Sequence, residues 1–204
     1  MSKLSTYLKQ EGFLATIKKI GSAFSKKSST TTFLHCKNLV PCSNRSAVIT
    51  KVLDSSNIAQ FNRIKFFSHI DGNCYIGSNN QLILLAYLND VLAGYIAAEW
   101  SRCKEIHGLG NFKLNNSEAW VGPVYVCRKY RGLGISSYLI GEIAKHLNDE
   151  FCIQTFYTCI NSTNYSSLHS FKKNGYKVIG SITVIDSSYS ESFIAEEIGR
   201  FERR

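Results

Sequence analysis

Apolar residues recur along this chain in short runs, some with a period of two and others with a period of three to four. Two runs, 81–88 and 91–100, are apolar almost throughout and flank an Asn-Asp pair typical of tight hairpin turns. A further apolar strand is expected at 118–127, and residues 134–148 repeat apolar positions at helical spacing. The pattern therefore predicts a sheet covered by helices.

The remaining segments continue this alternation of strands and helices. Further strands are expected at 33–39, 46–53, 153–160 and 176–185, and further helices at 54–67, 162–174 and 191–201. Residues 101–117 are polar and predict a loop. Because the segment 118–160 reads as strand, helix and strand, its two strands should lie parallel and adjacent, whereas the hairpin before them is antiparallel. The sequence thus predicts a mixed sheet in an α/β (α+β) fold.

The first 28 residues differ from the rest of the chain. Residues 3–24 place apolar side chains at roughly helical spacing, and residues 1–28 carry six lysines against one glutamate. A basic amphipathic helix of this kind can rest on an anionic membrane surface, or it can pack on its own domain or on a second subunit. A polar linker is expected at 25–32. We therefore divide the chain into a helical extension, 1–28, and a main domain, 29–204.

The composition restricts the class of protein. With 204 residues, of which 44% are hydrophobic, the chain fits a globular protein. The net charge is +9, but the excess is concentrated in residues 1–28, so no nucleic-acid-binding face is expected on the main domain. The seven cysteines include no C-x-x-C pair, which favours reduced thiols over a disulfide framework or a zinc site. Since no signal peptide and no membrane-length apolar run is visible, we expect a cytoplasmic protein. From the cysteine pattern, we also expect no bound metal.

A basic turn with two glycines lies between the strand at 118–127 and the helix that follows it. Arg131, Gly132 and Gly134 are its central residues. The first amides of a helix have no partner within the helix, and the helix dipole adds partial positive charge at that end. Successive amides in a glycine-rich turn also form a concave anion site. The turn is therefore suited to hold a phosphate or a pyrophosphate.

Three known phosphate loops compete for this turn. A Walker A loop requires a Gly-Lys-Ser/Thr ending that is absent, and a dinucleotide fingerprint requires glycine where Ser137 stands. The hexapeptide 131–136 instead resembles the acyl-CoA pyrophosphate loop of the GNAT family of N-acetyltransferases, whose pattern is Gln/Arg-x-x-Gly-x-Gly/Ala. Ser136 departs from the last position of that pattern with another small residue. The resemblance implies that acetyl-CoA is bound by the residues of this loop: Arg131, Gly132, Leu133, Gly134, Ile135 and Ser136.

A second motif strengthens the resemblance. Residues 164–176 keep every spacing of the family's Asn-x-x-Ala-x-x-x-Tyr-x-x-x-Gly-Phe segment, with Asn164, Phe171 and Gly175 in place. By this resemblance, Asn164 would hydrogen-bond the pantetheine arm or nearby cofactor groups, and Phe171 would lie along the cofactor near its sulfur. Gly175 would close the helix before the next strand. The similarity to the family covers about residues 46–185.

The resemblance implies the GNAT fold, a mixed central sheet with a splayed parallel strand pair flanked by helices. In that family the strand before the glycine turn offers backbone groups to the pantetheine, here from Val124, Tyr125 and Val126. One backbone N–H group in this stretch would hold the thioester oxygen as it becomes an oxyanion. Proline at position 123 is typical of a strand bulge or edge, and the family has a bulge near this point.

Acetyl transfer to an amine needs a base that removes a proton from the ammonium group. Glu118 is the first candidate. By a period of two, it shares a strand face with four other residues: Trp120, Gly122, Val124 and Val126. Glu99, on the neighbouring strand, and His107, in the loop after it, are the alternatives.

The departing thiolate also needs a proton source. Family members often use a tyrosine at the position of Phe171, and phenylalanine cannot donate a proton. Tyr125, Tyr165 or water could substitute, and the substrate's own proton could pass directly to the thiolate. The residues do not choose among these sources.

The resemblance implies an acetyl-CoA-dependent N-acetyltransferase that acts on a primary amine. Residues 1–40 loosely resemble the start of acetyltransferases associated with bacterial surface-glycan synthesis. That likeness implies a nucleotide- or lipid-linked amino sugar as the acceptor, with the N-terminal helix near the inner face of the cytoplasmic membrane. Acetylation of a protein lysine or N-terminus, and a non-catalytic acyl-CoA-binding domain, are the alternatives. A homodimer is compatible with each of these.

Overall fold

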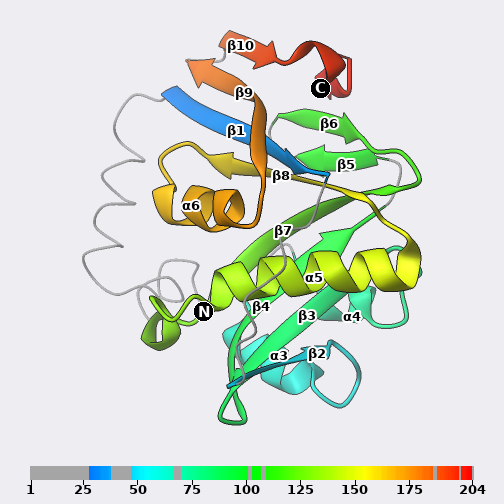
Figure 1. The fold of residues 1–204 in the computed structure, drawn as a ribbon, viewed down its shortest axis with the longest axis vertical. Coiled ribbons are helices and arrows are strands. Elements are labelled where there is room, and N and C mark those ends of the chain that lie inside the picture. The colour runs from blue at the N-terminus through cyan, green and yellow to red at the C-terminus, as the bar shows by residue number, and fades with distance from the viewer. Residues whose placement is uncertain are drawn as a thin grey trace.

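A computed structural model describes residues 28–37, 47–66, 70–100, 103–106, 109–185, 188–197 and 199–203. Within these ranges the chain forms an eight-stranded sheet and a three-stranded sheet, with helices on both faces of the larger one (Figure 1). The predicted N-terminal helix at 3–24 and the alternative base His107 lie outside the described residues. None of the helices within the described ranges is long and apolar enough to span a membrane.

The strands of the large sheet follow the order β10-β9-β1-β8-β7-β4-β3-β2. Their bounds are β1 Ser28–Cys36, β2 Val48–Val52, β3 Gln81–Leu88, β4 Val91–Glu99, β7 Glu118–Val126, β8 Thr155–Asn161, β9 Lys177–Ile185 and β10 Ser188–Phe193. The small sheet consists of β5 Cys103–Ile106, β6 Gly110–Lys113 and β11 Phe201–Arg203. The helices are α3 Ile58–Ile64, α4 Gly72–Tyr75, α5 Ile135–Phe151 and α6 Tyr165–Lys173, with short 3-10 turns at Arg128–Tyr130 and Ala195–Glu197.

Each face of the large sheet has its own hydrophobic core. Along β3, alternate residues point to opposite faces, so Leu84 packs in one core while Ile83 and Leu85 pack in the other. The core that contains Leu84 is completed by α5 and α6, and we call this side the α5 face. The opposite side, the α3 face, packs against α3, α4 and the small sheet.

The structure confirms the mixed sheet. β3 and β4 form the antiparallel hairpin, and β7 and β8 are parallel neighbours connected through α5. Every other strand pair within the described residues is antiparallel. The parallel pair therefore follows from its helical crossover, as the order of elements predicted.

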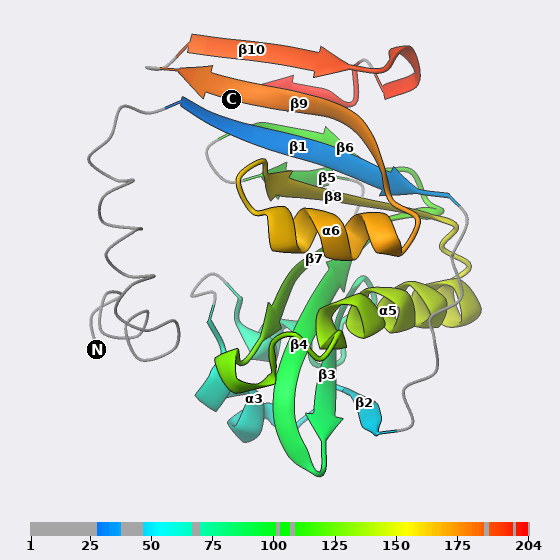
Figure 2. The ribbon, with the colours of Figure 1, turned by 60° about the vertical axis from the view of Figure 1, so that its left-hand side comes forward.

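The first described strand begins earlier than expected, and the prediction of a polar linker at 25–32 is wrong from Ser28 onward. β1 lies between β8 and β9 and is antiparallel to both (Figure 2). Its threonines are polar, but threonine favours strands, and here the hydroxyls find partners on the neighbouring chain segments. Thr30 Oγ1 lies 3.0 Å from Thr183 Oγ1, and Thr32 Oγ1 lies 2.7 Å from Ser162 Oγ.

Three other local predictions are corrected. The segment 101–117 is not only a loop, because it contains the β5–β6 hairpin. The helix expected at 191–201 is instead part of β10, a 3-10 turn and the start of β11. The helix expected at 54–67 is reduced to α3, with Asp54 accepting hydrogen bonds from the backbone of the preceding turn. Each miss involves a short element whose stability comes from tertiary contacts more than from its own pattern.

We expect Phe33→Ala to destabilise the protein by about 3–5 kcal/mol, the usual cost of removing a buried aromatic side chain. Phe33 is fully buried, and its ring contacts those of Phe112, Trp120 and Phe193. Val178→Ala on the neighbouring strand is the control, because Val178 is 46% exposed and should cost less than about 1 kcal/mol. Urea unfolding measures both. Small and equal losses of stability in the two variants would contradict the place of β1 between β8 and β9.

Candidate active site

The two parallel strands separate after a short contact. β7 and β8 pair only where Glu118–Trp120 lie beside residues 155–157, which we call the closed end. Beyond it, no strand pairing joins residues 121–126 to residues 158–161, all of them described, and these form the open end. Figure 2 shows β8, β1, β9 and β10 running at a steep angle to β7, β4 and β3. The facing strand edges at the open end can therefore offer backbone groups to a ligand.

A bulge in β7 lies where the strands begin to separate. Ile96 and Ala98 of β4 face Val124 and Val121, so two residue steps on β4 oppose three on β7. The extra residue falls at Gly122 and Pro123. Gly122 has a φ of +127°, a conformation that favours glycine. The predicted bulge is thus present in the structure.

Beyond the bulge, each side chain of β7 points to the face opposite to the one that a period of two predicts. Trp120 packs on the α3 face, as does Tyr125, whereas Val124 and Val126 pack against the core of the α5 face. The expectation that Glu118, Trp120, Val124 and Val126 share one face is therefore wrong beyond Trp120. One inserted residue shifts the period-two pattern for the rest of the strand.

The glycine turn follows β7 at the open end. Gly132 and Gly134 have φ values of +81° and +71°, and Gly134 is the N-cap of α5. A Cβ on Gly132 would have no atom within 4 Å, so the turn leaves open space beside its backbone. Arg131 Nε donates to the Val126 carbonyl over 3.1 Å, which ties the turn to the end of β7. Space, exposed helix amides and a helix dipole together fit the pyrophosphate group of acetyl-CoA.

The C-terminal end of α6 lies next to the start of α5. Ser136 Oγ lies 3.0 Å from Ser170 Oγ, and Asn174 Nδ2 donates to Ser137 Oγ over 2.8 Å. Asn164 is exposed and caps α6, with its side-chain oxygen accepting from the amide of Ser167. Its position beside the open end agrees with a role toward the cofactor, and that role stays a prediction.

Phe171 lies inside the protein and not along an exposed strand edge. It is 2% exposed, and its ring packs edge-on against Tyr176 with centroids 4.9 Å apart. A side chain with so little free surface supports the packing of α6 on the sheet. Its contact with the cofactor stays a prediction.

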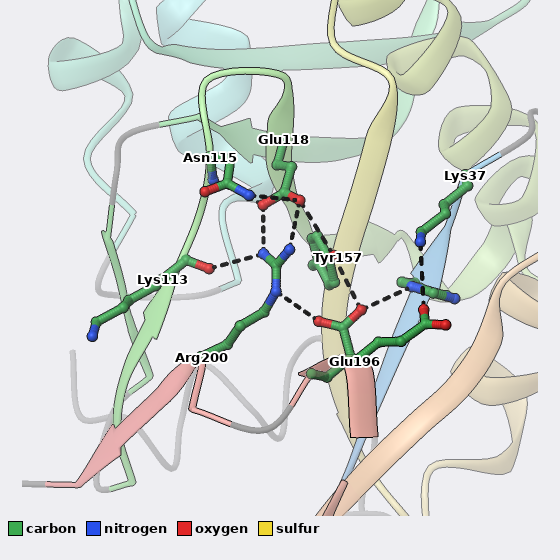
Figure 3. A network of polar contacts seen from close by, with 9 residues as sticks. Lys37, Lys113, Asn115, Glu118, Tyr157, Glu196 and Arg200 are labelled. Atoms are coloured by element: carbon green, nitrogen blue, oxygen red, sulfur yellow. Dashed lines mark hydrogen bonds and ion pairs between the residues drawn. The ribbon is translucent and has the colours of Figure 1, made fainter. Parts of the chain in front are cut away.

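The candidate base Glu118 lies in a dense polar network at the closed end (Figure 3). Arg200 donates to both of its carboxylate oxygens, over 2.6 and 2.9 Å, and the Asn115 amide donates over 2.8 Å. The Tyr157 hydroxyl lies 3.4 Å from the same carboxylate. Burial alone would raise the pKa of Glu118, but the hydrogen bonds from Arg200 and Asn115 outweigh it and lower the pKa. A carboxylate with occupied oxygens and weakened basicity is a poor general base.

Tyr157 and Glu197 complete this network on the side of β8. Burial raises the pKa of Tyr157, and the Glu118 and Glu197 carboxylates raise it further, so the hydroxyl remains a donor. Arg200 Nε lies 2.8 Å from a Glu197 oxygen, and Glu197 is 2% exposed. We call Glu118, Tyr157, Glu197 and Arg200 the Arg200 network.

Glu99 stands nearer to the point of separation. It is the β4 partner of Trp120, which is the last residue of β7 that pairs with β8. Its side chain is 14% exposed and forms an ion pair with Lys104 of β5. Lys104 also lies close enough to Cys159 of β8 to oppose the effect of burial, which raises the pKa of that thiol to about 12. Glu99 and Lys104 therefore lie beside the separated strands on the α3 face.

The tyrosines considered as proton donors lie in different surroundings. Tyr125 is 6% exposed and stacks on Phe66 at a centroid distance of 5.1 Å, whereas Tyr165 is 75% exposed at the start of α6. A further tyrosine, Tyr75, is the last residue of α4. Burial and the nearby Glu99 carboxylate raise its pKa to about 12, so its hydroxyl stays protonated.

Sequence reasoning missed Arg200, Tyr157 and Lys104. None of them belongs to a local motif, and their contacts join segments separated by many residues, for example 82 between Glu118 and Arg200. Arg200 is one of three arginines among the last five residues, and nothing in the sequence distinguishes it from the other two. In the described part of the chain, no three His, Cys, Asp or Glu side chains are grouped so that they could hold a metal ion.

We expect Glu118→Gln to lower the stability at pH 7 by roughly 1.5–3 kcal/mol, because a charge-assisted pair inside the protein is lost. The folded pKa of Glu118 lies below its usual value of 4.5. Its stabilisation is thus complete above pH 4.5 and is lost as the pH falls toward the folded pKa. Urea unfolding at pH 7, 5, 4 and 3.5 should show a smaller acid loss in the variant. Identical pH dependence in both proteins would contradict the observed pairing.

Comparison with known proteins agrees with this architecture. The model of the acetyltransferase (GNAT) family matches residues 50–176, which is more than half of the chain and includes both motifs. No curated protein matches the sequence. Likeness to solved structures at low identity shows the fold alone.

Three solved structures illustrate the shared fold. A protein assigned to the GNAT family from Novosphingobium aromaticivorans has a TM-score of 0.56 at 12% identity, over 77% of this chain and 63% of that one. A GCN5-related N-acetyltransferase from Kribbella flavida has a TM-score of 0.52 at 13% identity, over 81% and 70%. The aminoglycoside N-acetyltransferase AAC(6′)-Iy in complex with CoA has a TM-score of 0.52 at 15% identity, over 68% and 92%. The fold and the family match together show that the chain belongs to the GNAT family of acetyltransferases, which use acetyl-CoA as co-substrate.

Proposed function

We propose that this protein transfers the acetyl group of acetyl-CoA to a primary amine of a small molecule. The separation of β7 from β8, with the glycine turn at its open end, is the observation that carries the proposal. A strand edge that does not pair with β8 and a helix N-terminus in one place suit a molecule that has amide groups at one end and phosphates at the other. Pantetheine and pyrophosphate supply these groups in acetyl-CoA.

The cofactor-binding residues of the proposal come from three segments. The loop 131–136 would hold the pyrophosphate through its amides, the strand edge at 124–126 would pair with the pantetheine, and Asn164 would reach it from α6. Val124 and Val126 direct their side chains to the α5 face, so their backbone and not their side chains would contact the ligand. When bound, acetyl-CoA supplies the thioester carbon that the amine attacks. A backbone N–H group within 124–126 would stabilise the developing negative oxygen.

We propose Glu99 as the base in place of Glu118. Glu99 faces one lysine, whereas Glu118 is held by the two-pronged guanidinium of Arg200. It also lies beside Trp120, where the strands separate, and it is on the face opposite to α5. A carboxylate there can take the proton from the ammonium group, so that the neutral nitrogen attacks the thioester. The proton that the thiolate needs would come from water or from the substrate itself.

The acceptor in this proposal is an amino sugar, approaching from the α3 face. One solved structure with the same fold, AAC(6′)-Iy, is bound to the bisubstrate analogue CoA-S-monomethyl-acetylneamine, at 14% identity and a TM-score of 0.52. This neighbour supports a small amine as acceptor through fold likeness only. A nucleotide- or lipid-linked amino sugar of bacterial surface-glycan synthesis is the specific form that we propose, from the sequence likeness of residues 1–40.

A panel assay tests this function. The protein is given acetyl-CoA with amino sugars, nucleotide-linked amino sugars, aminoglycosides and lysine peptides, and released CoA thiol is measured together with product mass. Acetylated amino sugar supports the proposal, whereas acetylated peptide moves the acceptor to protein amines. Cofactor binding by calorimetry without thiol release from any acceptor would favour a non-catalytic acyl-CoA-binding domain. No binding of acetyl-CoA would reject all three.

We expect Gly134→Glu to weaken acetyl-CoA binding by roughly 100-fold or more, a loss of about 2.7 kcal/mol in binding free energy. The substitution places a side chain and a negative charge where the pyrophosphate would bind. Gly77→Glu is the matched control, since Gly77 has a similar φ of +70° and no atom within 4 Å of its Cβ position. Both variants therefore carry the same backbone penalty of about 1 kcal/mol. Calorimetry that gives equal affinities for the two folded variants would sink the loop assignment.

We expect Glu99→Gln to lower kcat by about 10²–10⁴-fold with an unchanged Kd for acetyl-CoA, as is usual when a general base is lost. Glu105→Gln serves as the control, because Glu105 is an exposed carboxylate on the same strand as Lys104. Steady-state kinetics with the best acceptor, over a range of pH, measures both variants. Normal turnover in Glu99→Gln would exclude Glu99 as the base.

A further inference from the structure

Arg200 contacts both strands of the parallel pair at once. Its guanidinium donates to Glu118 of β7 through Nη1 and Nη2, and its carbon centre lies 5.1 Å from the ring centroid of Tyr157 on β8. Its Nε faces Glu197, whose other oxygen lies 3.3 Å from the Tyr157 hydroxyl. Figure 3 shows the guanidinium of Arg200 pointing to Glu118, with Tyr157 beside it. A single side chain from the C-terminal segment thus joins two strands that the ladder joins only briefly.

These contacts coincide with the closed end. Glu118 is the first residue of β7 and pairs with Thr155, and Tyr157 pairs with Trp120 in the last of the three residue pairs. The Ser117 carbonyl accepts from the amides of Gln154 and Thr155 just before this contact. The Arg200 network therefore spans the whole length over which β7 and β8 are paired, and it includes no residue of the open end.

The charges in this network depend on one another. Glu118 and Glu197 are 6% and 2% exposed, and both face Tyr157, itself 1% exposed. Without the guanidinium, two buried carboxylates would face the same hydroxyl with their main counter-charge removed, and they would repel each other. The repulsion would act between β7, which carries Glu118, and the 3-10 turn that carries Glu197, beside Tyr157 of β8.

We propose that Arg200 is a positioning residue, which fixes the closed end of the β7–β8 pair and thereby sets the separation of the strands that receive acetyl-CoA. The proposal rests on the proposed function, because the separated edges are its cofactor site. The strand edge at 124–126 belongs to the same strand as Glu118, and the glycine turn follows that strand, so a change at the closed end alters their distance from β8. Cofactor binding to a preformed site is sensitive to such displacements.

Two variants of Arg200 and two control variants test this role. Arg200→Ala removes the contacts, and Arg200→Lys keeps the charge but loses the two-pronged geometry. Lys113→Ala is the local control, since Lys113 forms an exposed ion pair with Glu202 in the same part of the fold. Val48→Ala is the stability control, because it removes buried volume from β2, far from the parallel pair in the strand order.

We expect the Kd of acetyl-CoA, measured by calorimetry well below the melting temperature, to rise about tenfold in Arg200→Ala. Arg200→Lys should show a smaller rise, and the two controls should bind as the unmodified protein does. The inference is overturned if Arg200→Ala melts at a lower temperature, as Val48→Ala does, but keeps its affinity. If Arg200→Ala does not fold, unchanged affinity in Arg200→Lys overturns it equally.

Hydrogen exchange separates a failure of this inference from a failure of the proposed function. Without any cofactor, Arg200→Ala should speed amide exchange in peptides covering 118–120 and 155–157 more than Val48→Ala does. Faster exchange there in a protein that does not bind acetyl-CoA would reject the proposed function and keep the positioning of the strands. Equal exchange in the two variants would reject the positioning role.

Discussion

Backbone pairing between β7 and β8 ends after three residue pairs, and each strand then continues with a different neighbour. The other features of the candidate site follow from this ending. The bulge at Gly122 lies where the pairing ends, the glycine turn and α5 follow β7 at the open end, and α6 follows β8 at the same end. If β7 and β8 were paired along their whole length, their backbone N–H and C=O groups would bond to each other and none would remain for a ligand.

The parts of the site that depend on neighbouring residues could be predicted from the sequence. The glycine turn is an example, because the positive φ values of Gly132 and Gly134 and the start of a helix are local properties. The parallel strand pair was predictable for a similar reason, since a strand, a helix and a strand in succession almost always form a right-handed crossover. Asn164 likewise caps the helix that its motif implied.

The parts that depend on distant contacts could not be predicted. Pro123 predicts a bulge, but the period-two pattern does not show that the bulge moves Val124 to the face opposite to that of Glu118. The partner of Glu118 is Arg200, 82 residues away, so the carboxylate looks free in the sequence and is paired in the structure. The polar threonines before Phe33 predict a linker from the sequence. In the structure they belong to a strand, because hydroxyl groups on either side of it are their partners.

The place of β1 bears on how this chain reaches its fold. Its partners, β8 and β9, lie more than a hundred residues further along the sequence, so the middle of the sheet is built from contacts of high contact order. During synthesis, the earliest described strand waits with its apolar residues uncovered until the late ones leave the ribosome. We therefore expect slow folding, and a nascent chain that relies on chaperones for as long as Phe33 and Leu34 have nothing to pack against.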